Sequence, residues 1–185
     1  MMELGDVRLR PLEKSDIPAL WELHTPAVLE HMLTKVGSFE EMEAWLEAGI
    51  GRKDVLAFVV EEGAGAVIGT TRIASIDLAN KSCEIGSTFY AERVQRSHVN
   101  TGVKFMLLRH CFEELGMIRV QFKTDAENGR SQRALERIGA IKEGVLRNER
   151  IRSTGKPRDA VLYSIVDREW PEVKEKLLGI MNKYT

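Results

Sequence analysis

One short stretch constrains the fold more than any other, because a strand pattern in it runs directly into a capped helix. Residues 118–123 alternate apolar and polar side chains, which predicts a strand. Asn128 and Ser131 then lie three residues apart at the start of a helix predicted over 131–138, and Gly139 is its stop signal. At that helix start the asparagine amide and the serine hydroxyl either cap the helix or face a ligand across its end.

Strand and helix patterns alternate along the rest of the chain. Two helices follow the first strand, one capped by Ser15 or Asp16 and one by a capping box of Ser38 with Glu41. A longer helix opens at Asn100 or Thr101 and ends near Gly116, and a last helix follows Trp170. The predicted strands are 7–12, 55–60, 66–76, 81–90, 118–123, 140–152 and 159–166. This order predicts an α/β fold, with a mixed sheet that carries helices on both faces.

Composition indicates one globular domain over residues 1–185. The chain is 43% hydrophobic and 30% charged, and it contains no internal repeat or linker. No apolar run approaches the roughly 18 residues of a membrane span. The first residues lack the basic and apolar regions of a signal peptide. Cys83 and Cys111 fall inside a predicted strand and helix, which favours reduced packing residues and a cytoplasmic location.

Charge is unevenly distributed although the net charge is only −1. Residues 13–62 hold 11 acidic and 4 basic side chains, a net of −7, whereas residues 93–158 hold 15 basic and 7 acidic ones, a net of +8. These are either solvated faces or binding surfaces, the later one for an anion and the earlier one for a cation. A protein that binds nucleic acid is more often basic overall, so no nucleic-acid partner is expected.

Seven short motifs, taken in order, resemble the GNAT family of acetyl-CoA-dependent N-acetyltransferases. Within it they are most similar to the RimJ/RimL type of ribosomal-protein N-terminal acetyltransferases. The motifs are residues 7–12, 83–86, 99–101, 112–116, 123–139, 143–147 and 158–164. The resemblance implies the acyl-CoA N-acyltransferase fold, with a mostly antiparallel sheet. It also implies acetyl-CoA as cosubstrate, no metal, and direct attack of a primary amine on the thioester.

The stretch 90–102 links a strand to a helix start, where backbone N–H groups and the helix dipole favour an anion. The alternative is an ordinary connecting loop. The family's phosphate loop usually has two glycines, but His98 and Asn100 occupy those positions here, and Gly102 replaces a customary glutamate. The resemblance assigns coenzyme A contacts to Phe89, Tyr90, Gln95, Arg96, Ser97, His98, Val99, Asn100, Thr101, Gly102, Asn128 and Arg130.

Three chemical roles follow from the resemblance. Glu84 is the candidate that accepts the amine proton, directly or through water, although it could instead satisfy neighbouring groups, and His98 is a competing base. A backbone N–H at a strand bulge near Phe89 and Tyr90 is expected to bind the thioester oxygen. Ser131 is either a hydrogen-bond donor to the departing sulfur or only a helix cap.

The acceptor is a protein N-terminus or a small-molecule amine, and the sequence does not choose between them. A non-catalytic acyl-CoA-binding or sensor module on the same fold is the alternative function, and a plain interaction domain is a third. The early helices carry Trp21, His24, His31 and Trp45, which either border the acceptor groove or pack in the core. Dimers are common in the family, and the oligomeric state stays open.

Overall fold

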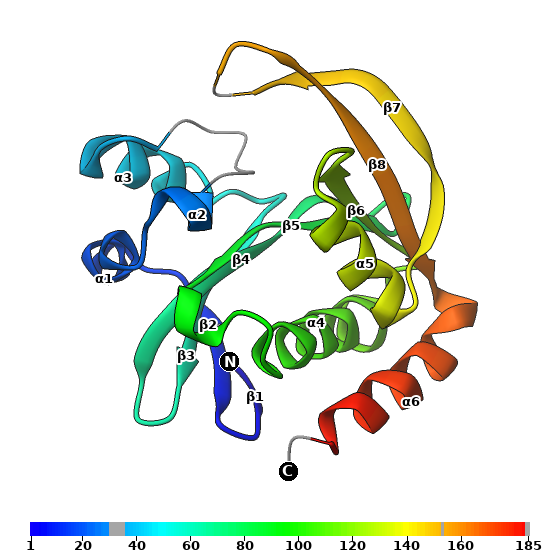
Figure 1. The fold of residues 1–185 in the computed structure, drawn as a ribbon. Helices are drawn as coiled ribbons and strands as arrows, with labels where there is room; N and C mark the ends of the chain where they lie inside the picture. Colours follow the sequence, from blue (N-terminus) through cyan, green and yellow to red (C-terminus); the bar gives the residue numbers. More distant parts are fainter. Residues whose placement is uncertain (30–35, 153, 184–185) are drawn as a thin grey trace.

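The computed structural model describes residues 1–29, 36–152 and 154–183. Within them eight strands form one sheet in the order β1-β2-β3-β4-β5-β6-β8-β7 (Figure 1). Only β5 and β6 pair in parallel; every other neighbouring pair is antiparallel. The strands are β1 (Met2–Leu4), β2 (Val7–Pro11), β3 (Leu56–Glu62), β4 (Ala66–Asp77), β5 (Ser82–Tyr90), β6 (Arg119–Asp125), β7 (Ile141–Ile151) and β8 (Pro157–Val166).

Helices cover both faces of this sheet (Figure 1). The helices α1, α2 and α3 lie on one side, and α4, α5 and α6 lie on the other. The bounds are α1 (Ile17–Glu22), α2 (Pro26–Leu29), α3 (Phe39–Glu47), α4 (Val99–Arg109), α5 (Gly129–Ile138) and α6 (Trp170–Met181), and a π-helical turn, His110–Glu114, extends α4. The predicted mixed, mostly antiparallel sheet flanked by helices is confirmed. The sequence patterns missed β1 and α2, which are only three and four residues long.

Local chemistry explains most of the helix ends. The Ser38 hydroxyl accepts the Glu41 N–H at 3.2 Å, as predicted, whereas the Glu41 carboxylate accepts from Gly37 N rather than completing the box at Ser38. Gly139 ends α5 with a φ of 99°, a left-handed conformation that glycine adopts without strain. Asp16, one of the two predicted caps, is the N-cap residue of α1, but its carboxylate binds the Arg10 guanidinium and the Glu13 N–H and makes no cap bond to the helix.

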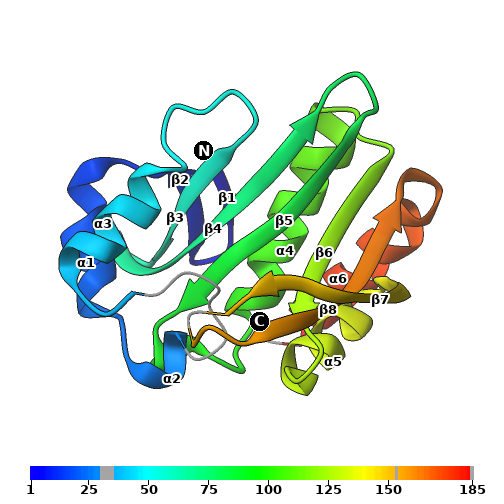
Figure 2. The same cartoon turned by 90° about the horizontal axis from the view of Figure 1, so that it is seen from above.

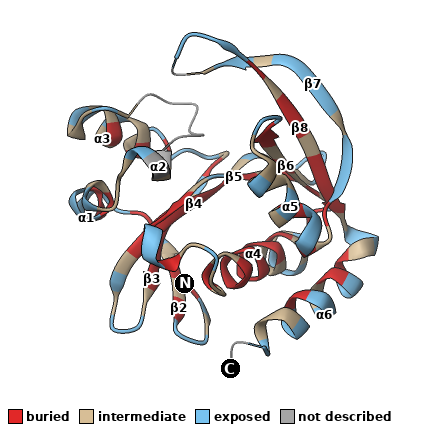
Figure 3. Ribbon diagram, in the orientation of Figure 1, coloured by how far each residue is buried: buried red, intermediate tan, exposed pale blue. Residues whose placement is uncertain are grey.

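The core has two parts, one on each face of the sheet. Alternation along β3 shows why, since Phe58 and Val60 enter the larger cluster with α4, α5 and α6, and Val59 enters the smaller one with α1 and α3. Helix α4 is buried nearly all round, from Val99 to Leu108. In contrast, β7 is exposed along most of its length (Figure 3). The inner strands of the sheet are therefore covered on both faces, and the edge strand β7 is not.

The sheet opens between β5 and β6. Their parallel pairing involves only residues 82–84 and 119–121, and the strands then diverge (Figure 2). On its other side β5 is bulged against β4, because Thr71 stands opposite both Ser87 and Thr88 between the regular pairs. Ser87 has a φ of 50° at this point. The divergence and the bulge place a gap in the middle of an otherwise continuous sheet.

Candidate active site

A cavity of about 880 Å³ occupies the gap between β5 and β6. The ends of these two strands form its sides, the starts of α4 and α5 border one end, and α3 with β4 borders the other. Ten of the candidate residues from the sequence meet here, on β5, α4, α5 and the loops before these two helices. The candidates that line the cavity are Glu84, Gln95, Arg96, Asn100, Asn128 and Ser131, together with Phe89, Tyr90, Ser97 and Arg130.

The start of α4 offers backbone donors to this cavity. The N-cap residue His98 makes no side-chain cap bond, although the Ser97 hydroxyl accepts the Val99 N–H at 3.2 Å. The first intrahelical bond is from Gly102 N to the His98 carbonyl at 2.9 Å. Nearby, the Gln95 amide donates to the Tyr90 carbonyl at 3.3 Å and its oxygen accepts from Arg130 at 3.1 Å. Gln95 therefore joins the end of β5 to α5 beside the N-terminus of α4, an arrangement that suits a phosphate group.

At the start of α5 one of the two alternatives for Asn128 is realised. The side-chain oxygen Oδ1 of Asn128 accepts the Ser131 N–H at 3.0 Å, so this side chain caps the N-terminus of the helix. This bond uses the oxygen and leaves the NH₂ group to reach a ligand in the cavity. The Ser131 hydroxyl is half-buried and also lines the cavity, one turn from the cap.

Glu84 sits where the sheet opens. It is paired in register with Gln121, the last residue of the β5–β6 ladder. Its Oε2 accepts from the Gln121 amide at 2.9 Å and lies 3.2 Å from Lys123 Nζ. The Lys123 Nζ also lies 3.7 Å from the Glu149 carboxylate, and that carboxylate lies 2.8 Å from the Arg158 guanidinium. The carboxylate is therefore held in place, with one oxygen bonded and its side chain facing the cavity.

The bulge of β5 is fixed by side chains on both faces of the sheet. The Thr88 hydroxyl is 2.7 Å from the Thr71 hydroxyl, and the Phe89 ring contacts the Trp45 ring at a centroid distance of 6.1 Å. Tyr90 is buried, and burial raises the pKa of its phenol. Within the described residues its buried hydroxyl has no hydrogen-bond partner.

Four residues of the predicted coenzyme A loop face away from the cavity. The His98 ring nitrogen lies 2.9 Å from the Asp6 carboxylate in the β1–β2 turn. Val99 and Thr101 are buried in the core side of α4. A Cβ at Gly102 would come within 3.2 Å of the Met181 methyl group in α6, so a side chain at this position would require Met181 to shift. The backbone N–H groups of Val99 and Gly102 are bonded within the protein, to the Ser97 hydroxyl and the His98 carbonyl.

Two buried cations that sequence reasoning missed also line the cavity. Lys104 reaches it from α4, and Arg72 reaches it from β4. Burial, and secondarily the positive charge of Arg52, lowers the pKa of Arg72 to about 10. Its guanidinium donates to the Trp45 carbonyl at 2.6 Å and so fastens the end of α3 to the sheet. Trp45 faces the cavity, Trp21 and His24 stack on each other, and His31 lies outside the described residues.

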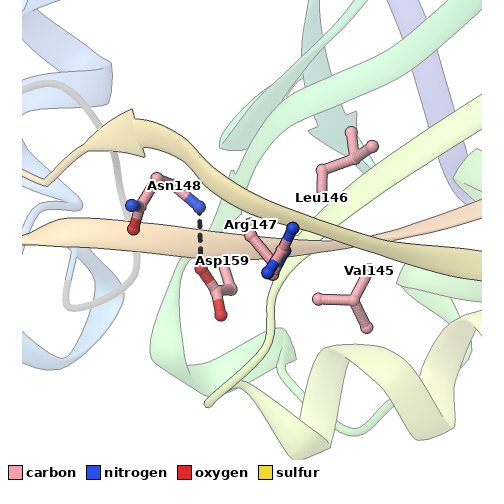
Figure 4. A pocket seen from close by; sticks show the side chains of 5 residues that line it. All are labelled: Val145, Leu146, Arg147, Asn148 and Asp159. Carbon is pink, nitrogen blue, oxygen red and sulfur yellow. Dashed lines mark hydrogen bonds between the residues drawn. The ribbon is translucent and has the colours of Figure 1, made fainter.

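A second hollow, of about 700 Å³, lies on the β7–β8 hairpin (Figure 4). Its lining is Val145, Leu146, Arg147, Asn148 and Asp159. The Asp159 carboxylate already accepts the Asn148 backbone N–H at 2.8 Å, drawn as the dashed line. This hollow is shallow, and its Asp159 carboxylate is already engaged by the hairpin backbone. The β5–β6 cavity is therefore the candidate active site.

Comparison with known proteins agrees with this geometry. The sequence pattern of the Acetyltransferase (GNAT) domain matches residues 6–141, which is most of the chain. The chain belongs to the GNAT family of acetyltransferases. YdaF of Bacillus subtilis, named a "putative ribosomal N-acetyltransferase", is 31% identical over 106 residues, 57% of either chain. The chain therefore spans just over half the length of that relative in the matched stretch.

Solved structures show the same fold over nearly the whole chain. A GCN5-related N-acetyltransferase from Brucella melitensis is 30% identical with a TM-score of 0.87, covering 96% of this chain and 83% of that one. RimJ of Mycobacterium smegmatis, in complex with CoA-disulfide, is 24% identical with a TM-score of 0.79, covering 94% and 88%. GNAT relatives thus bind coenzyme A, and the expected RimJ/RimL-type resemblance is confirmed. None of the described helices is long and apolar enough to cross a membrane.

Proposed function

We propose that this chain transfers the acetyl group of acetyl-CoA to a primary amine, either a protein N-terminus or a small-molecule amine, in one ternary complex. The single observation that supports this most is the cavity between β5 and β6. It joins the N-terminus of α4, suited to phosphates, to the Glu84 carboxylate, which is held where β5 and β6 begin to diverge. A long, thin acyl donor and an amine can enter such a cavity from opposite ends.

Glu84 is the proposed proton acceptor. A protein α-amine has a pKa of about 8 and a lysine amine about 10.4, so most of either is protonated at neutral pH and cannot attack. A carboxylate within direct or one-water reach removes that proton as the nitrogen attacks. The bonds from Gln121 and Lys123 hold the Glu84 carboxylate on the cavity wall, which supports this role.

Two further groups serve the thioester itself. A backbone N–H at the β5 bulge, beside Phe89 and Tyr90, donates to the carbonyl oxygen as negative charge develops there. The Ser131 hydroxyl donates a hydrogen bond to the sulfur as the carbon–sulfur bond breaks. The Asn128 NH₂ group and Arg130 hold the arm and phosphates of the donor, since both line the same end of the cavity.

The test is an acetyl-transfer assay with a panel of amines, in which free thiol is followed, paired with calorimetry of acetyl-CoA binding. We expect binding and release of thiol with at least one primary amine. No binding at millimolar acetyl-CoA would refute the proposal. Binding without transfer to any amine of a broad panel would favour the acyl-CoA sensor instead.

Matched variants separate ligand contacts from helix capping at the start of α5. Asn128→Asp keeps an oxygen that can accept the Ser131 N–H but removes the NH₂ donor, whereas Asn128→Ala removes both. We expect both variants to weaken acetyl-CoA binding, and only Asn128→Ala to lose about 1 kcal/mol of stability. If Asn128→Asp binds acetyl-CoA as the unchanged protein does, Asn128 is a cap alone.

A further inference from the structure

Lys104 is a buried cation that none of the roles above uses. It lies one turn after Asn100 on α4, so both side chains are on the face of the helix that borders the cavity. Its Nζ is 3.4 Å from the Thr88 hydroxyl at the β5 bulge and 5.8 Å from the centre of the Phe122 ring on β6. The ammonium group therefore lies between β5 and β6, where the two strands diverge.

No residue in the described part of the chain pairs a negative charge with Lys104. Within the described residues its one hydrogen bond is to the neutral Thr88 hydroxyl, and it forms no ion pair. The neighbouring ionisable groups are engaged elsewhere. On β5, Glu84 pairs with Lys123 of β6; on β6, Asp125 pairs with Arg152; and on α5, Arg130 contacts Gln95.

Burial of an amine without a counter-charge disfavours its protonated form, and it lowers the pKa of Lys104 to about 8. At neutral pH the group is still mostly an ammonium ion. The N-terminal end of α4 adds positive potential at the same cavity. An anion that forms inside the cavity would therefore be stabilised by both, and this is the charge that thioester aminolysis creates.

We propose that Lys104 is a further catalytic residue, whose ammonium group contacts the thioester end of the acyl donor and stabilises the negative charge on the departing sulfur. The proposal rests on the acetyl-transfer function given above. In the step concerned, the amine nitrogen bonds to the acyl carbon and the carbon–sulfur bond breaks with its electron pair on sulfur. The amine proton leaves to Glu84 or water, and the thiolate takes a proton from solvent after release.

The depth of Lys104 separates this role from phosphate binding. Lys104 is only 7% exposed and lies beside the bulge, beyond the first turn of α4. In contrast, Arg96 in the loop before α4 and Arg130 at the start of α5 are exposed residues at the mouth of the cavity. A lysine for phosphates would be expected at the mouth with them. The position of Lys104 beneath the bulge matches the place where the proposed backbone donor would hold the thioester oxygen.

Lys104→Met tests the proposal, because methionine keeps most of the side-chain length and removes the charge. Lys142→Met is the matched control, since Lys142 is exposed on β7 outside the cavity. We expect kcat to fall about 100-fold in Lys104→Met, the loss typical of one donor to a developing anion, with the KM for acetyl-CoA within about threefold of its original value. Thermal unfolding should show no loss of stability, because a desolvated charge has been removed.

A second readout does not depend on the acceptor amine. Bound coenzyme A is titrated by the ultraviolet absorbance of its thiolate, with the signal of the free protein subtracted. We expect the bound thiol pKa to lie at least about one unit below that of free coenzyme A in the unchanged protein and in Lys142→Met, a tenfold effect that Lys104→Met abolishes. Alkylation of Lys104→Cys with bromoethylamine, which rebuilds an amine at this position, should restore both the thiol pKa and kcat.

The outcomes are distinct. If coenzyme A does not bind the unchanged protein, the acetyltransferase function and the role of Lys104 both fail. If it binds but the thiol pKa is equal with and without the lysine, Lys104 has no part in stabilising the sulfur, and the function stands. If Lys104→Met weakens coenzyme A binding more than tenfold and leaves the thiol pKa unchanged, the lysine binds phosphate and the proposal is wrong.

Discussion

Strand β6 meets the sheet differently along its two edges. Against β8 all seven of its residues are paired, whereas against β5 only three are. On the β8 edge the backbone donors and acceptors are satisfied within the protein. On the β5 edge no described strand pairs with the residues beyond Gln121, and residues 122–125 line the cavity instead. The side of β6 that is fully paired with β8 is its closed edge, and the side toward β5, where most residues are unpaired, is its open edge.

The side chains along the two edges differ in the same sense. Along the closed edge, polar groups are paired within the protein, as in the bond from the Tyr163 hydroxyl to Glu136 at 2.8 Å. Along the open edge, Lys104 has no counter-charge within the described residues and the Tyr90 hydroxyl has no partner there. Substitutions on the closed edge should therefore change stability, and those on the open edge should change turnover.

The largest effect is expected from Tyr163→Ala on the closed edge. Tyr163 is fully buried opposite Phe122, so its truncation removes a large packed ring and should lower the free energy of unfolding by about 3–5 kcal/mol. The matched variant Tyr163→Phe removes only the hydroxyl and should lose about 1 kcal/mol. Urea unfolding measures both. A loss below about 1 kcal/mol for Tyr163→Ala would contradict the distinction between the edges.

The next effect is expected from Glu84→Gln on the open edge. Loss of the proposed base should lower kcat about 100-fold, which is about 2.7 kcal/mol in the barrier. The unfolding free energy should change by less than about 1 kcal/mol, because glutamine still accepts from the Gln121 amide. Glu172→Gln, at an exposed position of α6, is the control. Steady-state kinetics with unchanged kcat in Glu84→Gln would remove Glu84 from the mechanism.

A smaller effect is expected at the bulge that widens the open edge. Ser87 has a φ of 50°, a region that β-branched residues enter only with strain. Ser87→Val should lower the unfolding free energy by about 1–2 kcal/mol and reduce kcat as the bulge shifts. Ser87→Gly, which suits this φ, should keep both within about 0.5 kcal/mol. Equal values for the two variants would show that the bulge does not depend on this backbone conformation.

Local patterns in the sequence located the elements on both edges but not the difference between them. The seven predicted strands and the Gly139 stop depend on alternation and on one backbone conformation, so a short window contains the information. The pairing of β6 with β8 on one side and its brief pairing with β5 on the other depend on residues more than 30 positions apart. No local pattern encodes where two parallel strands begin to diverge.

The candidate site was predictable in part for the same reason. Asn128, Ser131 and Glu84 stood out because their motifs are contiguous, and the structure brings all three to one cavity. Lys104 was missed because the strongly apolar α4 looked like a packing helix. One signal was available in the sequence, which is a single lysine among the apolar residues of α4. On a helix that is buried nearly all round, such a lysine cannot reach solvent. Its burial could be inferred only once α4 was known to be covered on both sides.

The smallest effect is expected from Glu143, which holds the closed edge together across three strands. Its carboxylate binds Arg119 of β6 at 2.6 and 2.7 Å and accepts from Ser164 of β8 at 2.6 Å. The Arg119 bond, followed by the Ser164 bond, lowers the pKa of Glu143 to about 2. A carboxyl whose pKa is lower in the folded chain contributes stability above its ordinary pKa of about 4.3. That contribution is lost as the pH falls toward 2.

Glu143→Gln should therefore be less stable than the unchanged protein at pH 7 and equally stable near pH 2. The difference at pH 7 should be about 1 kcal/mol or less, because a third of the side chain is exposed and water screens the pair. Urea unfolding at a series of pH values measures this, and the decline between about pH 4.5 and pH 2 should be shallower in the variant. Parallel curves would mean that the three-strand contact adds nothing to the closed edge, whose stability would then come from the backbone ladder and the buried rings alone.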